Sequence, residues 1–199
     1  MPTRLRRVEQ VERNRELVLA AAQRVFIARG YAGATLDAIA DEAGFSKGVV
    51  YSQFGSKPDL FFALLSQRIE QRAANNYRSV AGLAGVDAFQ ALLRAGAEDD
   101  ESEPGWQFVL TEFRAQAVRN PDLNRRYAEM HSRAVDHLAA ALAQVYGAAG
   151  QAPAIPTRSL AELIFATATG VTLERSANPS SIPDHHLAEL FLPALGFAR

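Results

Sequence analysis

Residues 35–54 carry the signals of two short helices joined by a tight turn, and this pattern limits what the chain can fold into. Thr35 is a hydroxyl residue placed to cap a first helix. Apolar residues then recur from Leu36 to Ala43 at spacings that share one helical face. Gly44 is free to take the positive φ at which a helix stops, and Ser46 is the next candidate cap. The pattern predicts a helix-turn-helix.

The second of these helices, through Phe54, has the composition of a surface that reads DNA. Val50 and Phe54 are four residues apart on its inner side, and its other residues are small, polar or basic. In a helix-turn-helix this second helix lies in the DNA major groove. The only two lysines of the chain, Lys47 and Lys57, bracket it. An ordinary surface hairpin of an all-α protein is the alternative.

The run from Leu17 to Leu64 resembles the N-terminal domain of the tetracycline-repressor (TetR) family of bacterial transcriptional regulators. The matching residues are in register: Ala21, Ala22, Phe26, Gly30, Tyr31, Thr35, Ile39, Ala40, Ala43, Gly44, Ser46, Tyr51, Phe54, Ser56, Lys57 and Leu60. Two positions differ from many members. Gln53 stands where many members have histidine, and it can still donate a hydrogen bond to a phosphate. Val49 stands where a hydroxyl or small polar residue is frequent, so the expected contact there is apolar, for example with a thymine methyl group.

The helix-turn-helix and the resemblance together give a set of expected DNA contacts. These are Thr35, Ser46, Lys47, Gly48, Val49, Tyr51, Ser52, Gln53 and Lys57. The residue that matches Tyr51 in the family contacts phosphate. Lys57 opens the next helix, where backbone N–H groups and the positive end of the helix dipole also favour an anion. The expected partner is double-stranded DNA with a palindromic operator.

Charge is distributed unevenly along the chain. Residues 1–60 carry nine basic and seven acidic side chains, whereas residues 61–199 carry twelve basic and fifteen acidic ones. A basic end that faces phosphates and a mildly acidic body are expected of a DNA-binding head on a regulatory domain. For the arginine-rich residues 1–8, a flexible solvated arm is the alternative to a DNA contact.

Composition excludes several other classes of protein. An apolar fraction of 48% with 22% charged residues indicates a globular chain. No apolar run approaches the roughly 20 residues that cross a bilayer, and the first residues lack the apolar segment of a signal peptide. The sequence has no cysteine, which excludes disulfides and thiolate metal sites and fits a reducing cytoplasm. We therefore expect a cytoplasmic protein without a membrane partner.

The helical periodicity predicts an all-α fold of about nine helices, with no strand. A three-helix head, residues 1–56, would precede a helical regulatory and dimerisation body, residues 57–199. The acidic segment Glu98 to Glu103 is expected as a solvated loop, because it lacks the pattern of a calcium site. Helices are expected at residues 9–28, 36–43, 47–54, 57–80, 86–97, 106–119, 122–146, 157–176 and 183–195.

The last two expected helices are unusually apolar. Their helix-spaced apolar residues are Leu160, Leu163, Ile164 and Val171, then Leu187, Leu190, Phe191 and Ala194. Burial within one chain is the simple explanation. The resemblance instead implies that these helices pair with their copies in a four-helix dimer interface. A homodimer would place two reading helices about one DNA turn apart (~34–36 Å), as a palindrome requires.

The middle helices offer aromatic and adaptable side chains: Phe89, Trp106, Phe113, Tyr127, Met130 and His131. Such a set can be plain core. The resemblance implies an effector cavity among these helices, and this set would suit a largely apolar small molecule with one or two polar atoms.

Motifs for catalysis are absent from the sequence. His131 and His137 are six residues apart, so a regular helix places them on different faces, and His185 and His186 are adjacent. There is no nucleophile elbow, phosphate-binding glycine loop or zinc-type His-Glu spacing. We expect no enzyme, metal or cofactor. The sequence predicts a homodimeric repressor released from its operator by an effector; the alternative is a DNA-bound scaffold whose body binds a protein partner.

Overall fold

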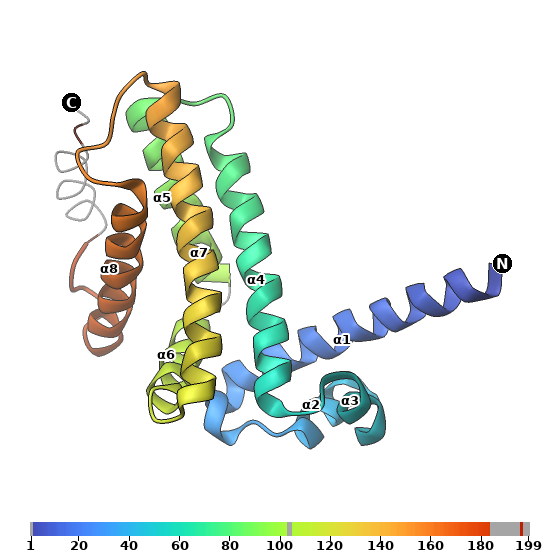
Figure 1. Ribbon diagram of the computed structural model, residues 1–199. Coiled ribbons are helices and arrows are strands. Elements are labelled where there is room, and N and C mark those ends of the chain that lie inside the picture. The colour runs from blue at the N-terminus through green and yellow to red at the C-terminus, as the bar shows by residue number, and fades with distance from the viewer. Residues whose placement is uncertain (1, 103–104, 184–195, 197–199) are drawn as a thin grey trace. The chain divides into compact units, whose positions relative to one another are not determined.

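The computed structural model describes residues 2–102, 105–183 and 196 of the 199-residue chain (Figure 1). Within these ranges the chain forms eight helices and no strand, which confirms the all-α class. The helices are α1 (Pro2–Gly33), α2 (Leu36–Ala43), α3 (Lys47–Phe54), α4 (Lys57–Val80), α5 (Gly85–Ser102), α6 (Trp106–Ala117), α7 (Pro121–Ala148) and α8 (Thr157–Ala177). Nearly all of the expected ninth helix, residues 183–195, lies outside the described residues.

The contacts divide the chain into two compact units. We call residues 1–68 with 104–128 the head unit, and residues 69–103 with 129–199 the body unit. The head unit holds the first three helices together with α6, and α1 packs against both α2 and α6. The functional domain boundary expected after residue 56 stays a prediction.

Helix α1 begins earlier than the sequence pattern indicated. It starts at Pro2, so residues 2–8 continue the helix instead of forming a separate arm. Val11 near its start is exposed, whereas Val18 and Phe26 further along are fully buried. The regular helix breaks at Gly30, two residues after the end of the helix expected at residues 9–28. Its φ of 69° and ψ of 171° belong to a region that essentially only glycine adopts.

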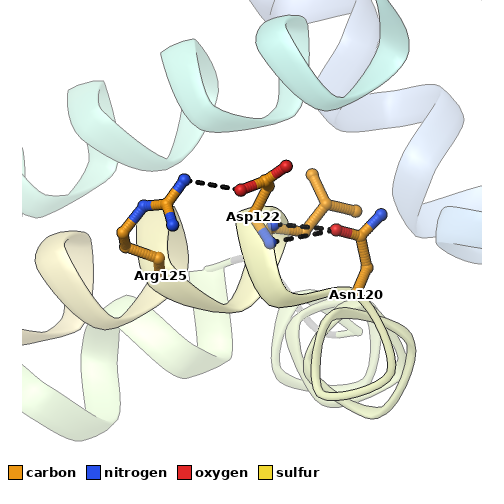
Figure 2. A network of polar contacts seen from close by, with 4 residues as sticks. Asn120, Asp122 and Arg125 are labelled. Carbon is orange, nitrogen blue, oxygen red and sulfur yellow. Dashed lines mark hydrogen bonds and ion pairs between the residues drawn. The ribbon is translucent and has the colours of Figure 1, made fainter.

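Two helix boundaries follow from local chemistry. The Asn120 side chain caps α7, because its Oδ1 accepts from the backbone N–H groups of Asp122 (3.1 Å) and Leu123 (3.2 Å), as Figure 2 shows. The expected loop over Glu98 to Glu103 is wrong up to Ser102, because α5 continues to that residue. The glutamates in this stretch are good helix formers, and acidic composition alone does not end a helix.

The core of the body unit is built from the second half of α4 together with α5, α7 and α8. Its fully buried large side chains include Phe89, Val135, Leu142 and Val145. In Figure 1, α5, α7 and α8 run lengthwise beside one another. Among the described residues, no helix is long and apolar enough to cross a membrane.

Candidate nucleic-acid interface

Both ends of α2 are closed as the sequence predicted. The Thr35 hydroxyl oxygen accepts from the backbone N–H of Ala38 at 3.1 Å. Gly44 takes the left-handed conformation, with φ 72° and ψ 25°. The N–H of Phe45 then reaches the carbonyl of Ala40 at 3.0 Å, which completes a Schellman-type end. The turn into α3 is therefore short and well defined.

Helix α3 is held by one apolar face. Val50 is fully buried and Phe54 nearly so, and the guanidinium of Arg15 on α1 lies 5.0 Å from the centre of the Phe54 ring. Ser46 occupies the cap position of α3, but its side chain makes no capping hydrogen bond, contrary to the prediction. Its backbone carbonyl accepts the first helical bond instead, from Val49 at 3.0 Å.

Seven of the nine expected contact residues are exposed, and they form a surface that we call the α3 outer face. Tyr51, with 49% of its surface exposed, is the largest side chain on it. Ser52 turns its hydroxyl to the carbonyl of Val49 at 2.9 Å, which leaves its oxygen as an acceptor. The members are Thr35, Ser46, Lys47, Gly48, Val49, Tyr51 and Ser52.

Lys47 forms an exposed ion pair with Asp37 of α2. Its Nζ lies 2.5 Å from the Asp37 carboxylate, and this hydrogen bond raises the pKa of Lys47. Exposed pairs of this kind contribute little stability and are screened by salt. The charge of Lys47 is therefore available for exchange to a phosphate.

Gly48 has no structural reason to be glycine. A Cβ at this position would meet only the Ser46 Oγ, at 4.0 Å, and its φ is not positive. Glycine within a helix costs up to about 1 kcal/mol relative to alanine. The lack of a side chain leaves the backbone of α3 open to close approach from outside.

Gln53 does not belong to the α3 outer face. Its Nε2 donates toward the carbonyl of Val11 on α1 at 3.4 Å, and its Oε1 is buried, with no hydrogen-bond partner in the described chain. Residue 53 lies on the side of α3 that faces α1, and the phosphate contact expected of Gln53 stays a prediction.

Lys57 is also turned away from the outer face. Its Nζ donates to the carbonyls of Tyr31 (2.8 Å), Ala32 (3.2 Å) and Ala34 (3.0 Å). An ammonium has three N–H donors, so these carbonyls engage all of them. Burial lowers the pKa of Lys57, whereas the Glu112 carboxylate opposes this shift. In this structure the ammonium therefore makes internal contacts, and the phosphate contact expected of Lys57 stays a prediction.

Three of the six expected effector residues are packed core of the head unit. The Phe61 ring stacks on Phe113 at 4.3 Å and on Trp106 at 5.6 Å, and Phe113 lies 6.1 Å from Tyr127. Burial raises the pKa of Tyr127. Phe113 is fully buried, and Trp106 and Tyr127 nearly so. For these three residues the contacts support the plain-core alternative.

The other three expected effector residues lie in the body unit. Phe89 is fully buried in its core, and Met130 and His131 are half-buried. The His131 ring makes an edge contact with Phe165 of α8, with 5.5 Å between ring centres. The six residues are therefore divided between the two units and do not assemble as one site within either.

Four of the eight expected dimer residues lie on α8, within the described part of the chain. Leu160 and Val171 are buried within the chain, Ile164 is half-buried, and Leu163 is 52% exposed. Leu187, Leu190, Phe191 and Ala194 lie outside the described residues.

Asn76 is a candidate that the sequence analysis missed. It shares a buried stripe of α4 with Ile69, Ala73 and Val80, and only 4% of its surface is exposed. Its backbone carbonyl accepts from the Ser79 hydroxyl at 2.8 Å. The signal was present in the sequence as an amide at helical spacing within an apolar stripe.

The chain matches two family models. Residues 18–64 match the model for the N-terminal region of bacterial regulatory proteins of the tetR family, and residues 86–195 match the C-terminal domain of BetI-type transcriptional repressors. The second match alone spans more than half of the 199 residues.

Curated relatives are transcriptional regulators and not enzymes. The activator FasR of Mycolicibacterium smegmatis is 44% identical over 64 residues, which cover 32% of this chain and 29% of FasR. The repressor AcnR of Corynebacterium efficiens is 26% identical over 119 residues, which cover 60% of this chain and 58% of AcnR. The chain thus spans less than two thirds of the length of these relatives.

Crystal structures share the fold over most of the chain. A TetR-family regulator from Rhodococcus sp. superposes with a TM-score of 0.74 at 21% identity, covering 92% of this chain and 96% of that one. FadR from Bacillus subtilis, in complex with stearoyl-CoA, superposes with a TM-score of 0.73 at 17% identity, covering 92% of this chain and 99% of FadR. The capped helix-turn-helix and the two family matches show that the chain belongs to the tetR family of bacterial regulatory proteins.

Proposed function

We propose that the chain is a cytoplasmic, homodimeric transcriptional repressor that binds a palindromic DNA operator through the α3 outer face. The observation that carries this proposal is the division of α3 into two sides. Val50 and Phe54 anchor one side, while the other side presents polar, small and basic groups that no packing requirement explains. Such a helix supplies base contacts in the major groove.

Duplex selection with the full chain tests the proposal. A random-sequence library should yield an inverted repeat whose half-sites lie about one DNA turn apart, roughly 10 base pairs. Val49→Ala should change the preferred base at one position or weaken binding by about 1–3 kcal/mol. Leu17→Ala, which truncates another exposed apolar residue, on α1, is the control and should leave selection unchanged. A library from which no sequence is enriched contradicts the proposal.

We further propose that the body unit binds a small effector through Asn76. Asn76 places a polar amide within an otherwise apolar stripe of α4, where a ligand carbonyl or hydroxyl would find a hydrogen-bond partner. The effector would therefore combine an apolar body with one such polar group. Because FadR is known with stearoyl-CoA, a panel of long-chain acyl thioesters, free fatty acids and apolar drugs is a reasonable start.

Asn76→Leu separates an effector contact from a structural role. Leucine has a similar branched shape and no polar atoms, so the variant should fold as wild type does. The proposal requires that an effector which releases wild-type protein from its operator no longer releases this variant. Full release of the variant would remove Asn76 from the effector site. If no panel member acts but a protein partner does, the scaffold alternative is favoured.

A further inference from the structure

We propose that Glu112 of α6 is a positioning residue for operator binding, because it fixes the turn that orients α2 and α3 on α1. We call this turn, residues 30–34, the head turn. The inference rests on the proposed DNA-binding role of α3 and adds to it a residue that lies outside the helix-turn-helix.

The Glu112 carboxylate binds two consecutive backbone N–H groups of the head turn. Its Oε2 lies 2.7 Å from the N of Tyr31, and its Oε1 lies 3.0 Å from the N of Ala32. These N–H groups follow the break at Gly30, where the regular helical pairing of α1 is interrupted. Hydrogen bonds to a charged acceptor are about twice as strong as neutral ones. The carboxylate thus acts as a cap that a distant helix supplies.

The Glu112 carboxylate lies against Gly30. A Cβ at Gly30 would lie 2.6 Å from the Glu112 Oε2, so a side chain there would require the carboxylate to move. The φ of 69° and ψ of 171° at Gly30 also exclude other residues without strain. The backbone geometry and the carboxylate position are therefore specified together.

Lys57 holds the opposite side of the head turn through the carbonyls of Tyr31, Ala32 and Ala34. A carboxylate from α6 and an ammonium from α4 therefore fix both the donors and the acceptors of one short segment. Thr35, the next residue, caps α2, and α2 packs on α3. A change in the position of Glu112 thus reaches the reading helix through directly bonded atoms.

The competing explanation is that Glu112 only stabilises the fold. In that case its removal lowers the melting temperature but leaves the folded protein with wild-type operator affinity. A positioning role instead lowers discrimination between operator and random DNA in protein that is fully folded. The two roles separate when binding is measured well below the melting temperature of every variant.

The test compares Glu112→Gln with Asp122→Asn in the full chain. Each substitution replaces a carboxylate of the head unit by its amide, but Asp122 is bonded only locally, to Arg125 at 2.5 Å (Figure 2). Removing a negative charge favours DNA nonspecifically, so both variants should bind random duplex as well as wild type or better. Glu112→Gln should nevertheless bind the selected operator roughly tenfold more weakly, as expected for a lost charge-assisted hydrogen bond. Asp122→Asn should not.

A second variant keeps the test valid if the amide does not fold. Glu112→Asp retains the charge but is one methylene shorter, so it cannot reach both N–H groups, and it should show the same selective loss. Wild-type operator affinity in either folded variant, or equal losses on both duplexes, overturns the role of Glu112 alone. A wild-type protein that prefers no duplex to random sequence overturns the proposed function, and this inference with it.

Discussion

The Nζ of Lys57 lies 2.8 Å from the carbonyl oxygen of Tyr31 and 4.6 Å from the centre of its ring. The first residue of α4 is thus bonded to the segment that leaves α1. Burial raises the pKa of the Tyr31 phenol to about 12, which shows how far this ring is removed from water.

Lys57→Met should destabilise the protein without a specific loss of phosphate contact. Methionine fills similar space but donates no hydrogen bonds, so the free energy of unfolding should fall by roughly 2 kcal/mol. A lysine bound to phosphate would instead contribute about one unit to the salt dependence of DNA binding. Urea unfolding and salt titration of operator binding measure the two quantities. If stability is unchanged and the slope of operator affinity against salt concentration falls by one unit, Lys57 contacts phosphate instead.

Gly48→Ala should improve folding and impair DNA binding in the same protein. Alanine relieves a helix penalty of up to about 1 kcal/mol, and no protein atom obstructs its Cβ. If DNA approaches the α3 backbone here, that methyl group weakens operator affinity. Gly147→Ala in α7 is the control, because its Cβ also meets no atom within 4 Å. Thermal melting and operator titration check both variants; a stabilised Gly48→Ala protein with wild-type affinity argues against close approach.

Tyr51→Phe should weaken operator binding by about 1–2 kcal/mol while leaving the fold intact. The Tyr51 ring is half exposed on the α3 outer face, and its hydroxyl would donate to a phosphate. Tyr77→Phe, in the body unit, removes the same hydroxyl group elsewhere and should have no effect on binding. Equilibrium binding to the selected operator measures the difference. Equal affinities of the Tyr51→Phe and wild-type proteins would remove the hydroxyl from the interface.

Leu163→Glu should convert the protein to a monomer. Leu163 is more than half exposed on α8, and dimer formation would desolvate a charge placed there at a cost of several kcal/mol. Leu83→Glu introduces the same charge at another exposed apolar residue of the body unit and should leave association unchanged. Sedimentation velocity across a concentration series distinguishes these results. A Leu163→Glu protein with the dissociation constant of wild type would exclude this face of α8.

Asp59→Asn should remove part of the acid sensitivity of the fold. The Ser56 hydroxyl and the Arg126 guanidinium both donate to this carboxylate, and they lower the pKa of Asp59 below its ordinary value of 3.8. Because its pKa is depressed by folding, Asp59 stabilises the protein above pH 3.8 and loses this contribution as pH falls through the lower, folded value. Urea midpoints between pH 2 and pH 6 should therefore decline less steeply in the variant. An identical decline would mean that the pair contributes nothing measurable.

Local signals predicted the frame of the site well. Thr35 and Gly44 close α2 as their residue types indicated, and Val50 and Phe54 are buried at the spacing that defined the inner face of α3. These features depend on neighbours within a few residues. Capping and periodicity therefore suffice to place the buried face of this short helix.

Long-range contacts decide the features of the site that local sequence patterns do not report. Lys57 and Gln53 are residue types that often bind phosphate. In the structure, however, Lys57 donates to carbonyls of residues 31–34 and Gln53 donates to the carbonyl of Val11. Trp106 and Phe113 are residue types that often line a ligand cavity. In the structure, however, the Phe61 ring of α4 stacks on both of them. Glu112 gave no local signal, because its two partners come from another part of the chain. No spacing rule within one helix reports such pairings.

The bonds from Glu112 to Tyr31 and Ala32 join residues separated by 81 and 80 positions. During synthesis the helix-turn-helix therefore leaves the ribosome long before the carboxylate that completes its head turn. The same separation limits how such proteins can be recombined. A fragment cut after Arg68 loses α6 and with it both backbone caps and the aromatic cover of Phe61. A chimera that is to keep these two backbone bonds must carry residues 105–128 along with the first 68.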